Sequence, residues 1–201
     1  MKDGEWVSSA VVNCIVDVLV LEQFTNDDLV KRYYFPSYFA EKILKDEPPS
    51  LDELNAFYDP SLLRYDLWQY DMLFIPLCIL HHWFLYVINL RDKKMQILNS
   101  LPEFIIQIEP KHHFRMKETC SQILSHLSGT PMPITEWGVE FTYLPIQKNK
   151  SDCGIFMIKY MEYWDGQLTK SFSQDDIPYF RRKITADLLL HSENKIKYLQ
   201  F

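Results

Sequence analysis

The first part of the chain shows the spacing of hydrophobic residues that is typical of helices. Trp6–Leu21 is apolar almost all round, with Asn13 and Asp17 four residues apart as its polar exceptions, so we expect a largely buried, central helix. An amphipathic pattern then runs from Asn26 to Pro36 and predicts a second helix. A short helix is expected to follow and to end near Leu44.

The sequence Ser50-x-x-Glu53 matches a capping box, in which each side chain satisfies a free backbone N–H of the first helical turn. It predicts a helix over residues 51–58. The pattern then changes to short apolar and aromatic runs, which predict strands at Met72–Leu80, Trp83–Leu90 and Met95–Leu98. A charged turn at residues 91–94 joins the last two into a hairpin in the core of a sheet.

The rest of the chain returns mainly to helical spacing. We expect a helix from about Arg115 that ends before Gly129, a strand at Val139–Leu144, a buried helix at Gly154–Trp164 and a closing helix at Pro178–His191. With 201 residues, 47% of them hydrophobic, the chain can bury roughly 70% of its unfolded surface. We therefore expect one α+β domain over residues 1–201.

Charge and cysteine usage narrow the class of protein. The net charge is −6, and no long cluster of Lys and Arg offers a stripe for phosphates, which argues against nucleic acid as a partner. The longest apolar stretch, Met72–Leu80, is too short to span a bilayer. The cysteines are far apart, lack a CxxC pair and lie mostly in apolar runs that are typical of buried free thiols: Cys14, Cys78, Cys120 and Cys153. We expect a monomer of the nucleus or cytoplasm, with no membrane partner.

One cysteine differs from the others in its context. Cys153 lies in the run QKNKSDCGIF, directly before an expected helix, and Ser151 and Asp152 are good N-cap residues. In the first helical turn, free backbone N–H groups and the helix dipole would stabilise a thiolate. A buried core thiol is the more common explanation of a lone cysteine, so a nucleophile needs further support.

A candidate base lies 71 residues upstream. His82 opens a predicted strand in LHHWFLYVINL and is followed by Trp83. An imidazole can take the proton of a thiol and so make a thiolate. His82 could equally be an ordinary core or surface histidine, and His81 beside it is an alternative. The two segments together favour a cysteine peptidase.

Two motifs, His82-Trp83 and Gln147-x5-Cys153-Gly154, resemble the ubiquitin-like protein protease family, the SUMO-specific cysteine proteases with a C48-type catalytic domain. In that family the catalytic His is followed by Trp at the start of a strand, and the nucleophile lies in a Gln-x5-Cys-Gly pattern. The resemblance runs from Trp6 to about His191 and includes a segment similar to plant members. It implies a papain-like fold with a central mixed sheet flanked by helices, here without the family's usual N-terminal strand.

The resemblance also implies the roles of further residues. The third triad member, usually the Asp of an Asp-Ser pair, corresponds to Asn99, 17 residues after His82. An amide oxygen can hold the imidazole tautomer, but it cannot balance an imidazolium charge, so reduced activity is expected. Gln147 would donate to the oxyanion. Trp6 and Trp83 would form the walls of a tunnel for the modifier's Gly-Gly tail.

The expected function is therefore a cysteine peptidase or isopeptidase with a Cys-His-Asn triad and no cofactor, which cleaves after the Gly-Gly tail of a SUMO-like modifier in conjugates or precursors. One rival is a modifier-binding module that has lost turnover, because Asn99 replaces Asp and Ser9 replaces an acidic residue that grips the modifier. A weaker rival is acyl transfer to a protein. The pairs His81-His82 and His112-His113 are poor metal ligands, since neighbouring residues on a strand face opposite sides.

Overall fold

A mixed five-stranded sheet forms the centre of the protein, with the strands in the order β1-β2-β3-β4-β5. The computed structural model describes residues 4–25, 30–45, 47, 49–55, 63–107 and 109–192. The strands are β1 (Arg32–Tyr34), β2 (Met72–Ile79), β3 (His82–Asn89), β4 (Lys94–Leu98) and β5 (Gly138–Phe141). β2, β3 and β4 are antiparallel, while β1 and β5 run parallel to their neighbours.

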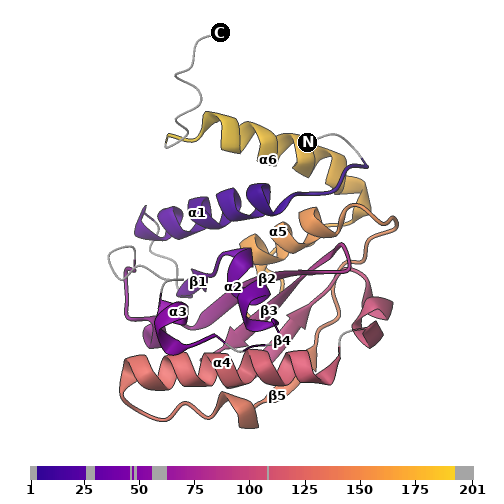
Figure 1. The fold of residues 1–201 in the computed structure, drawn as a ribbon. Helices are drawn as coiled ribbons and strands as arrows, with labels where there is room; N and C mark the ends of the chain where they lie inside the picture. The colour runs from indigo at the N-terminus through magenta and orange to yellow at the C-terminus, as the bar shows by residue number, and fades with distance from the viewer. Residues whose placement is uncertain are drawn as a thin grey trace.

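Helices cover both faces of this sheet, as expected for an α+β domain. They are α1 (Ser9–Thr25), α2 (Ser37–Ile43), α3 (Leu51–Asn55), α4 (Pro110–Ser128), α5 (Cys153–Tyr163) and α6 (Ile177–Leu190). Short 3-10 turns are η2 (Leu67–Gln69), η3 (Pro102–Gln107), η4 (Ile134–Glu136) and η5 (Gln174–Asp176). Figure 1 shows α6, α1 and α5 stacked on one side of the sheet and α4 on the other.

The central strand β3 separates two hydrophobic cores. Its residues Trp83, Leu85 and Val87 belong to the core under α1, α5 and α6. The alternate residues, Phe84 and Tyr86 among them, belong to the core under α2 and α4. Because successive side chains of a strand point to opposite faces, a strand covered on both faces is apolar throughout. This explains why the run Trp83–Leu90 shows no alternation of polar and apolar residues.

The most deeply buried helix is α5 rather than α1. Every residue of α5 from Cys153 to Met161 is buried. In α1 one stripe is exposed, at Ala10, Cys14, Asp17 and Leu21. The expectation of a largely buried, central first helix was therefore wrong, because α1 packs against α5 but leaves this stripe exposed.

The second predicted helix is also wrong over the residues that the structure describes. Residues 26–29 lie outside them, but β1 forms a strand where helical spacing extended to Pro36. Tyr33 and Tyr34 are both buried, one in each core. Pairing with β2 supplies the backbone hydrogen bonds of β1, and aromatic residues fit a pleated sheet well. This tertiary pairing outweighs the local helical pattern.

The remaining elements follow the predictions closely. Ser50 and Glu53 form the expected capping box, with the Glu53 N–H 3.3 Å from Ser50 Oγ and the Ser50 N–H 3.0 Å from Glu53 Oε2. The rest of the predicted helix at 51–58 lies outside the described residues. α4 begins at Pro110, earlier than the predicted Arg115, since proline suits the first helical turn. None of the described helices is long and apolar enough to cross a membrane.

Candidate active site

His82 and Asn99 meet at one end of the β3–β4 hairpin. Asn99 Oδ1 lies 2.7 Å from His82 Nε2 and accepts a second hydrogen bond, 2.9 Å long, from the backbone N–H of Leu101. A backbone N–H only donates, so the Asn99 atom between these two partners is the amide oxygen. Nε2 of His82 therefore carries a proton, and Nδ1 is left as the acceptor. The predicted His–Asn pair is present.

Burial keeps His82 neutral. Its ring lies 4.5 Å from the Phe104 ring and 6.4 Å from the Phe84 ring, measured between centroids. This burial lowers the pKa of His82 below its usual 6.5, and the hydrogen bond to Asn99 and the charge of Glu103 oppose the shift only in part. A neutral imidazole near pH 7 is the form that can accept a proton.

The Asn99 amide is bonded on its oxygen only. The side chain is buried, and its Nδ2 has no hydrogen-bond partner among the described residues. Leaving a buried amide nitrogen unpaired costs about 1–3 kcal/mol. The structure therefore bears this cost at the residue that orients His82.

Cys153 is the first residue of α5, in the predicted first turn. Burial raises the pKa of its thiol, while the backbone N–H groups of Trp83, Gly154 and Cys153 itself lower it, and the Asp152 charge raises it further. The N–H groups that were expected to stabilise a thiolate are thus in place. Burial outweighs them, so the net shift of the Cys153 pKa is upward.

The nucleophile and the base come from opposite faces of the sheet. His82 packs with Phe84 and Phe104, which belong to the core under α4, whereas Cys153 belongs to the core under α5. The Trp83 backbone N–H contacts the Cys153 sulfur, and Trp83 directly follows His82 in β3. Cys153 therefore lies against the residue that directly follows His82, at the start of β3.

Gln147 is held next to this pair by Ser100. The Gln147 Oε1 accepts from Ser100 Oγ at 2.6 Å, and its backbone N–H donates to the Ser100 carbonyl at 2.9 Å. Its Nε2 donates to the Asn149 carbonyl at 2.5 Å, which leaves the second N–H of the amide for another acceptor. Consecutive residues, Asn99 and Ser100, thus hold the base and the amide. No pattern in the sequence predicted that Ser100 would hold Gln147.

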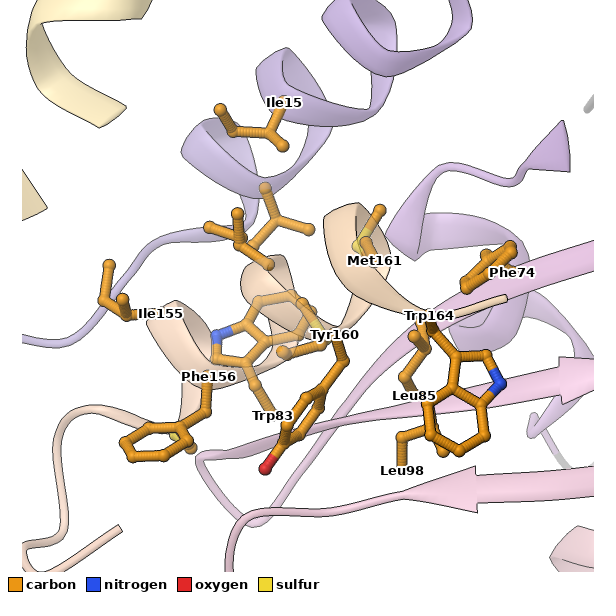
Figure 2. Packing of buried hydrophobic residues seen from close by; sticks show 14 of the residues in the cluster. Ile15, Phe74, Trp83, Leu85, Leu98, Ile155, Phe156, Tyr160, Met161 and Trp164 are labelled. Carbon is orange, nitrogen blue, oxygen red and sulfur yellow. The ribbon is translucent and has the colours of Figure 1, made fainter. Parts of the chain in front are cut away.

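The two tryptophans predicted to contact the substrate lie in different surroundings. Trp83 is 2% exposed, and its Nε1 donates to the Val7 carbonyl at 2.9 Å. Figure 2 shows its indole among the side chains that α5 and the sheet bury. Trp6 is 48% exposed, with its ring 5.6 Å from that of His81. Only Trp6 offers a wide surface, and the tunnel stays a prediction.

The contact between Trp6 and His81 helps to distinguish the two candidate histidines. His81 lies in the turn between β2 and β3 with φ of 62°, and its ring stacks edge-on against Trp6. His82 is the one that contacts Asn99. The pattern of the sequence left both histidines open as the base, and the geometry selects His82.

Gly154 is required by the close approach of two segments. A Cβ at this position would lie 2.6 Å from Val7 Cβ and 3.2 Å from Trp83 Cδ1. Atoms of this kind do not approach so closely without displacement, so only glycine fits between α5, β3 and the segment before α1. The glycine after the cysteine thus lets the first turn of α5 reach Trp83.

Sequence reasoning missed three residues around the loop before Cys153, namely Asn149, Gln174 and Arg181. All three bond to the Asp152 carboxylate, which was predicted as an N-cap and bonds to these side chains instead. By residue type, Arg181 looks like an ordinary surface cation of an amphipathic helix. Helical spacing does place it, unlike Arg182, on the apolar face with Ile177 and Ile184, but the sequence does not indicate its partner.

Metal sites and cavities elsewhere in the described part of the chain offer no alternative to this site. It contains no group of three or more His, Cys, Asp or Glu side chains arranged to hold a metal ion. A cavity of about 690 Å³ lies between α1, α5 and α6, and none of the predicted site residues lines it. The chemistry that the sequence predicted is therefore concentrated at the end of the sheet.

Comparison with known proteins identifies the family. The model of the Ulp1 protease family, C-terminal catalytic domain, matches residues 5–196, so the chain belongs to this family. Ubiquitin-like-specific protease ESD4 of Arabidopsis thaliana is 30% identical over 192 residues, which cover 94% of this chain and 38% of that protein. Human sentrin-specific protease 2 is 26% identical, with 86% of this chain and 31% of that protein covered.

Solved structures of the family share the fold. The C-terminal Ulp1 protease domain in complex with Smt3, the yeast ortholog of SUMO, matches with a TM-score of 0.70 at 17% identity over 92% of this chain and 76% of that one. A SUMO protease Ulp1 with its catalytic cysteine oxidised to a sulfinic acid gives 0.71 at 17% identity, over 94% and 79%. The predicted fold class is confirmed. The chain spans less than two fifths of the length of the curated relatives reported above.

Proposed function

We propose that this protein is a cysteine peptidase or isopeptidase that cleaves after the Gly-Gly tail of a SUMO-like modifier, in conjugates or in precursors. Cys153 is the nucleophile, His82 the base, Asn99 the residue that orients His82, and Gln147 an oxyanion donor. Membership of the Ulp1 protease family supports the reaction class. The observation that carries the proposal is the 2.7 Å contact between His82 Nε2 and Asn99 Oδ1, at the start of a strand whose next residue, Trp83, contacts the Cys153 sulfur through its backbone N–H.

The first chemical step forms a thioester. Nδ1 of His82 takes the proton of the Cys153 thiol as the sulfur attacks the carbonyl carbon of the terminal glycine. Negative charge then develops on the carbonyl oxygen, where the Cys153 backbone N–H and the Gln147 amide stabilise it. The imidazolium of His82 returns its proton to the leaving amine as the carbon–nitrogen bond breaks.

The second step releases the modifier. Water attacks the thioester carbonyl, His82 takes a proton from that water, and the Cys153 sulfur leaves and is reprotonated. Asn99 holds the Nε2–H tautomer through both steps but supplies no negative charge to the imidazolium.

Two relatives bear on the substrate class. The solved Ulp1 domain with the fold of this chain is bound to Smt3, and the similar plant proteins are named ubiquitin-like-specific proteases. Trp6, exposed beside the site, supplies an apolar wall for a modifier tail. A narrow path along Trp6 would select glycines, because any larger side chain would collide with the indole.

The test uses a panel of ubiquitin-like modifiers, each with an electrophile at its C-terminus. We expect a covalent adduct with a SUMO-like modifier, with the modified residue located at Cys153 by mass spectrometry. Cys153→Ser should form no adduct and should show no turnover, because the hydroxyl is far less ionised than the thiol. Cys14→Ser is the matched control, since Cys14 is an exposed free thiol on α1 that should not affect labelling.

Three outcomes would count against the proposal. Labelling at Cys14 in place of Cys153 would show that the probe reports exposure alone. An adduct without turnover of any modifier fusion would instead support a binding module that has lost activity. Full turnover in Cys153→Ser would overturn the assignment of the nucleophile.

A further inference from the structure

The carboxylate directly before the nucleophile is buried and fully bonded. Asp152 is 3% exposed. Its Oδ1 accepts from Arg181 at 3.1 Å to Nε and 2.5 Å to Nη2. Its Oδ2 accepts from Asn149 Nδ2 at 2.6 Å and from Gln174 Nε2 at 2.7 Å. Four donors from three segments therefore converge on a residue whose own peptide bond leads to Cys153.

The cation of this network comes from a distant element. Arg181 is 1% exposed and lies on α6, and its Nη2 also reaches the Ser151 carbonyl at 3.3 Å. Gln174 adds to the same attachment, because its Oε1 accepts from the Lys148 backbone N–H at 2.7 Å. The loop of residues 147–152 is thus tied to α6 and to the turn before it.

Stability alone is a poor reason for such a pair. Removing two charges from water generally costs as much as their attraction returns, and well-packed hydrophobic residues of similar volume are often as stable. The pair between Arg181 and Asp152 lies next to the one residue whose position and ionisation determine the proposed reaction. A role in the site accounts for its location.

The charges around the sulfur act in opposite directions. The negative charge of Asp152 opposes ionisation of the Cys153 thiol, and the guanidinium of Arg181 on Asp152 offsets that charge. The thiol of Cys78 on β2 also interacts electrostatically with Cys153. Arg181 is the cation whose ion pair lies nearest along the chain to the nucleophile.

We propose that Arg181 is a positioning residue for the nucleophile: through the Asp152 carboxylate it fixes the loop that presents the Cys153 thiol and offsets the negative charge beside that thiol. The proposal rests on the assignment of Cys153 as the nucleophile. Arg181 acts through Asp152 and does not itself contact the reacting atoms.

The experiment measures alkylation of Cys153 by iodoacetamide as a function of pH, followed by mass spectrometry, in three variants of the full chain. Arg181→Met leaves the Asp152 charge uncompensated, so the rate profile should move to higher pH. Asp152→Asn removes that charge, so the profile should move to lower pH. Arg181→Lys keeps the charge but loses the planar fork, so its profile should stay near that of the wild type.

Turnover of a modifier fusion gives a second readout. Arg181→Met and Arg181→Lys should both lower kcat by about 10- to 100-fold with little change in KM, because a small displacement of the nucleophile affects the chemical step. Lys159→Met is the matched control, since Lys159 is also a buried cation, paired with Glu162 on α5. It should lower stability and leave the alkylation profile unchanged.

The outcomes separate this role from a merely structural one. Shifts of the same sign in Arg181→Met and Asp152→Asn, or a shift in Lys159→Met equal to that in Arg181→Met, would overturn the positioning role. If the profiles of Arg181→Met and Asp152→Asn shift in opposite directions but the wild type cleaves no modifier, the positioning role is upheld and the proposed function fails. Turnover by the wild type, with unmoved profiles in folded variants, would uphold the function and reject the role of Arg181.

Discussion

The loop that carries Cys153 and the hairpin that carries His82 are held in opposite ways. The loop depends on a buried ion pair to a distant helix, in which Asp152 accepts hydrogen bonds on both oxygens. The hairpin depends on one neutral oxygen of Asn99, which His82 shares with the Leu101 N–H. The ion pair between Asp152 and Arg181 is charged and joins residues that are far apart in sequence. The hydrogen bond between Asn99 and His82 is made by a neutral amide within one hairpin.

This difference indicates where the site is sensitive. The hairpin can form from neighbouring strands, so the His82–Asn99 pair needs only local structure. The nucleophile loop needs α5 and α6 to pack before its charge is neutralised. Damage to packing should therefore act on Cys153 first, whereas a change of one atom at Asn99 should act on His82 alone.

The largest expected effect is on the nucleophile side, at Trp83. Trp83→Ala removes a 2% exposed side chain that packs on the first turn of α5, and should lower the free energy of unfolding by roughly 3–5 kcal/mol. Trp6→Ala should change stability little, because Trp6 is 48% exposed, yet it should impair cleavage of full-length modifier substrates more than alkylation. Urea unfolding and the two rate assays measure these quantities. Equal losses of stability in both variants would contradict the contrast.

The base side is tested at Asn99. Asn99→Ala frees the imidazole to rotate and should lower kcat by about 100-fold. It should also cost about 1–3 kcal/mol in stability, because the His82 and Leu101 N–H groups lose their acceptor. Asn99→Asp should keep or raise turnover, because a carboxylate balances the imidazolium, although it places an oxygen where Nδ2 has no partner among the described residues. Activity that appears only in Asn99→Asp would show a decayed enzyme. Indifference of a working enzyme to both changes would remove Asn99 from the triad.

A methyl group at Gly154 gives a smaller, purely steric test of the nucleophile side. Gly154→Ala places a Cβ 2.6 Å from Val7 Cβ and should destabilise the protein by about 1–3 kcal/mol despite the better helix propensity of alanine. Gly138→Ala is the control, since its Cβ would meet nothing within 4 Å among the described residues. Thermal unfolding compares the two, and an equal effect would mean that the approach of Val7 is looser than the structure shows.

The smallest expected effects are on the pH dependence of the free energy of unfolding, which should differ between the His82 side and the Asp152 side. Burial lowers the pKa of His82 below 6.5, so the unfolded chain binds this proton more readily, and the free energy of unfolding should fall as pH drops below 6.5. Burial would raise the pKa of Asp152, but hydrogen bonds from Arg181, Asn149 and Gln174 hold it below 3.8. Its stabilisation should therefore persist at pH 5 and be lost only as pH falls through that lower pKa.

Urea unfolding at pH 7, 6, 5 and 4 measures this difference. His112 and His113 also have pKa values lowered by burial, so His82→Gln should remove part of the slope between pH 7 and 5 and not all of it. Asp152→Asn should leave that slope unchanged. A flat stability from pH 7 to 5 in the wild type would show that the histidines are not held neutral by the fold.

The sequence predicted most of the elements but not their relative depth. Strong local signals, such as the Ser50–Glu53 capping box and the apolar run of β3, were confirmed because they do not depend on distant contacts. The prediction was wrong at β1, where pairing with β2 outweighs helical spacing. It also placed α1 at the centre, because a mostly apolar helix does not reveal that Cys14 and Leu21 face solvent.

For the site, the motif around Cys153 and the order of His82 and Asn99 pointed to a pair that the structure brings into contact. The sequence could not show that burial raises the pKa of the Cys153 thiol, because desolvation depends on the packing of segments that are distant in sequence. It could not single out Arg181 either. Helical spacing places Arg181 on the apolar face with Ile177 and Ile184, but nothing in the sequence indicates that it pairs with Asp152.

The ion pair between Asp152 and Arg181 also bears on synthesis of the protein. Ribosomes deliver Cys153, His82 and Gln147 before α6, so a nascent chain that stops at Trp164 already contains these groups but not Arg181. In that partial chain the Asp152 carboxylate has no cation from α6, and the loop before Cys153 lacks its attachment. The loop before Cys153 can therefore take its final position only after α6 has been synthesised.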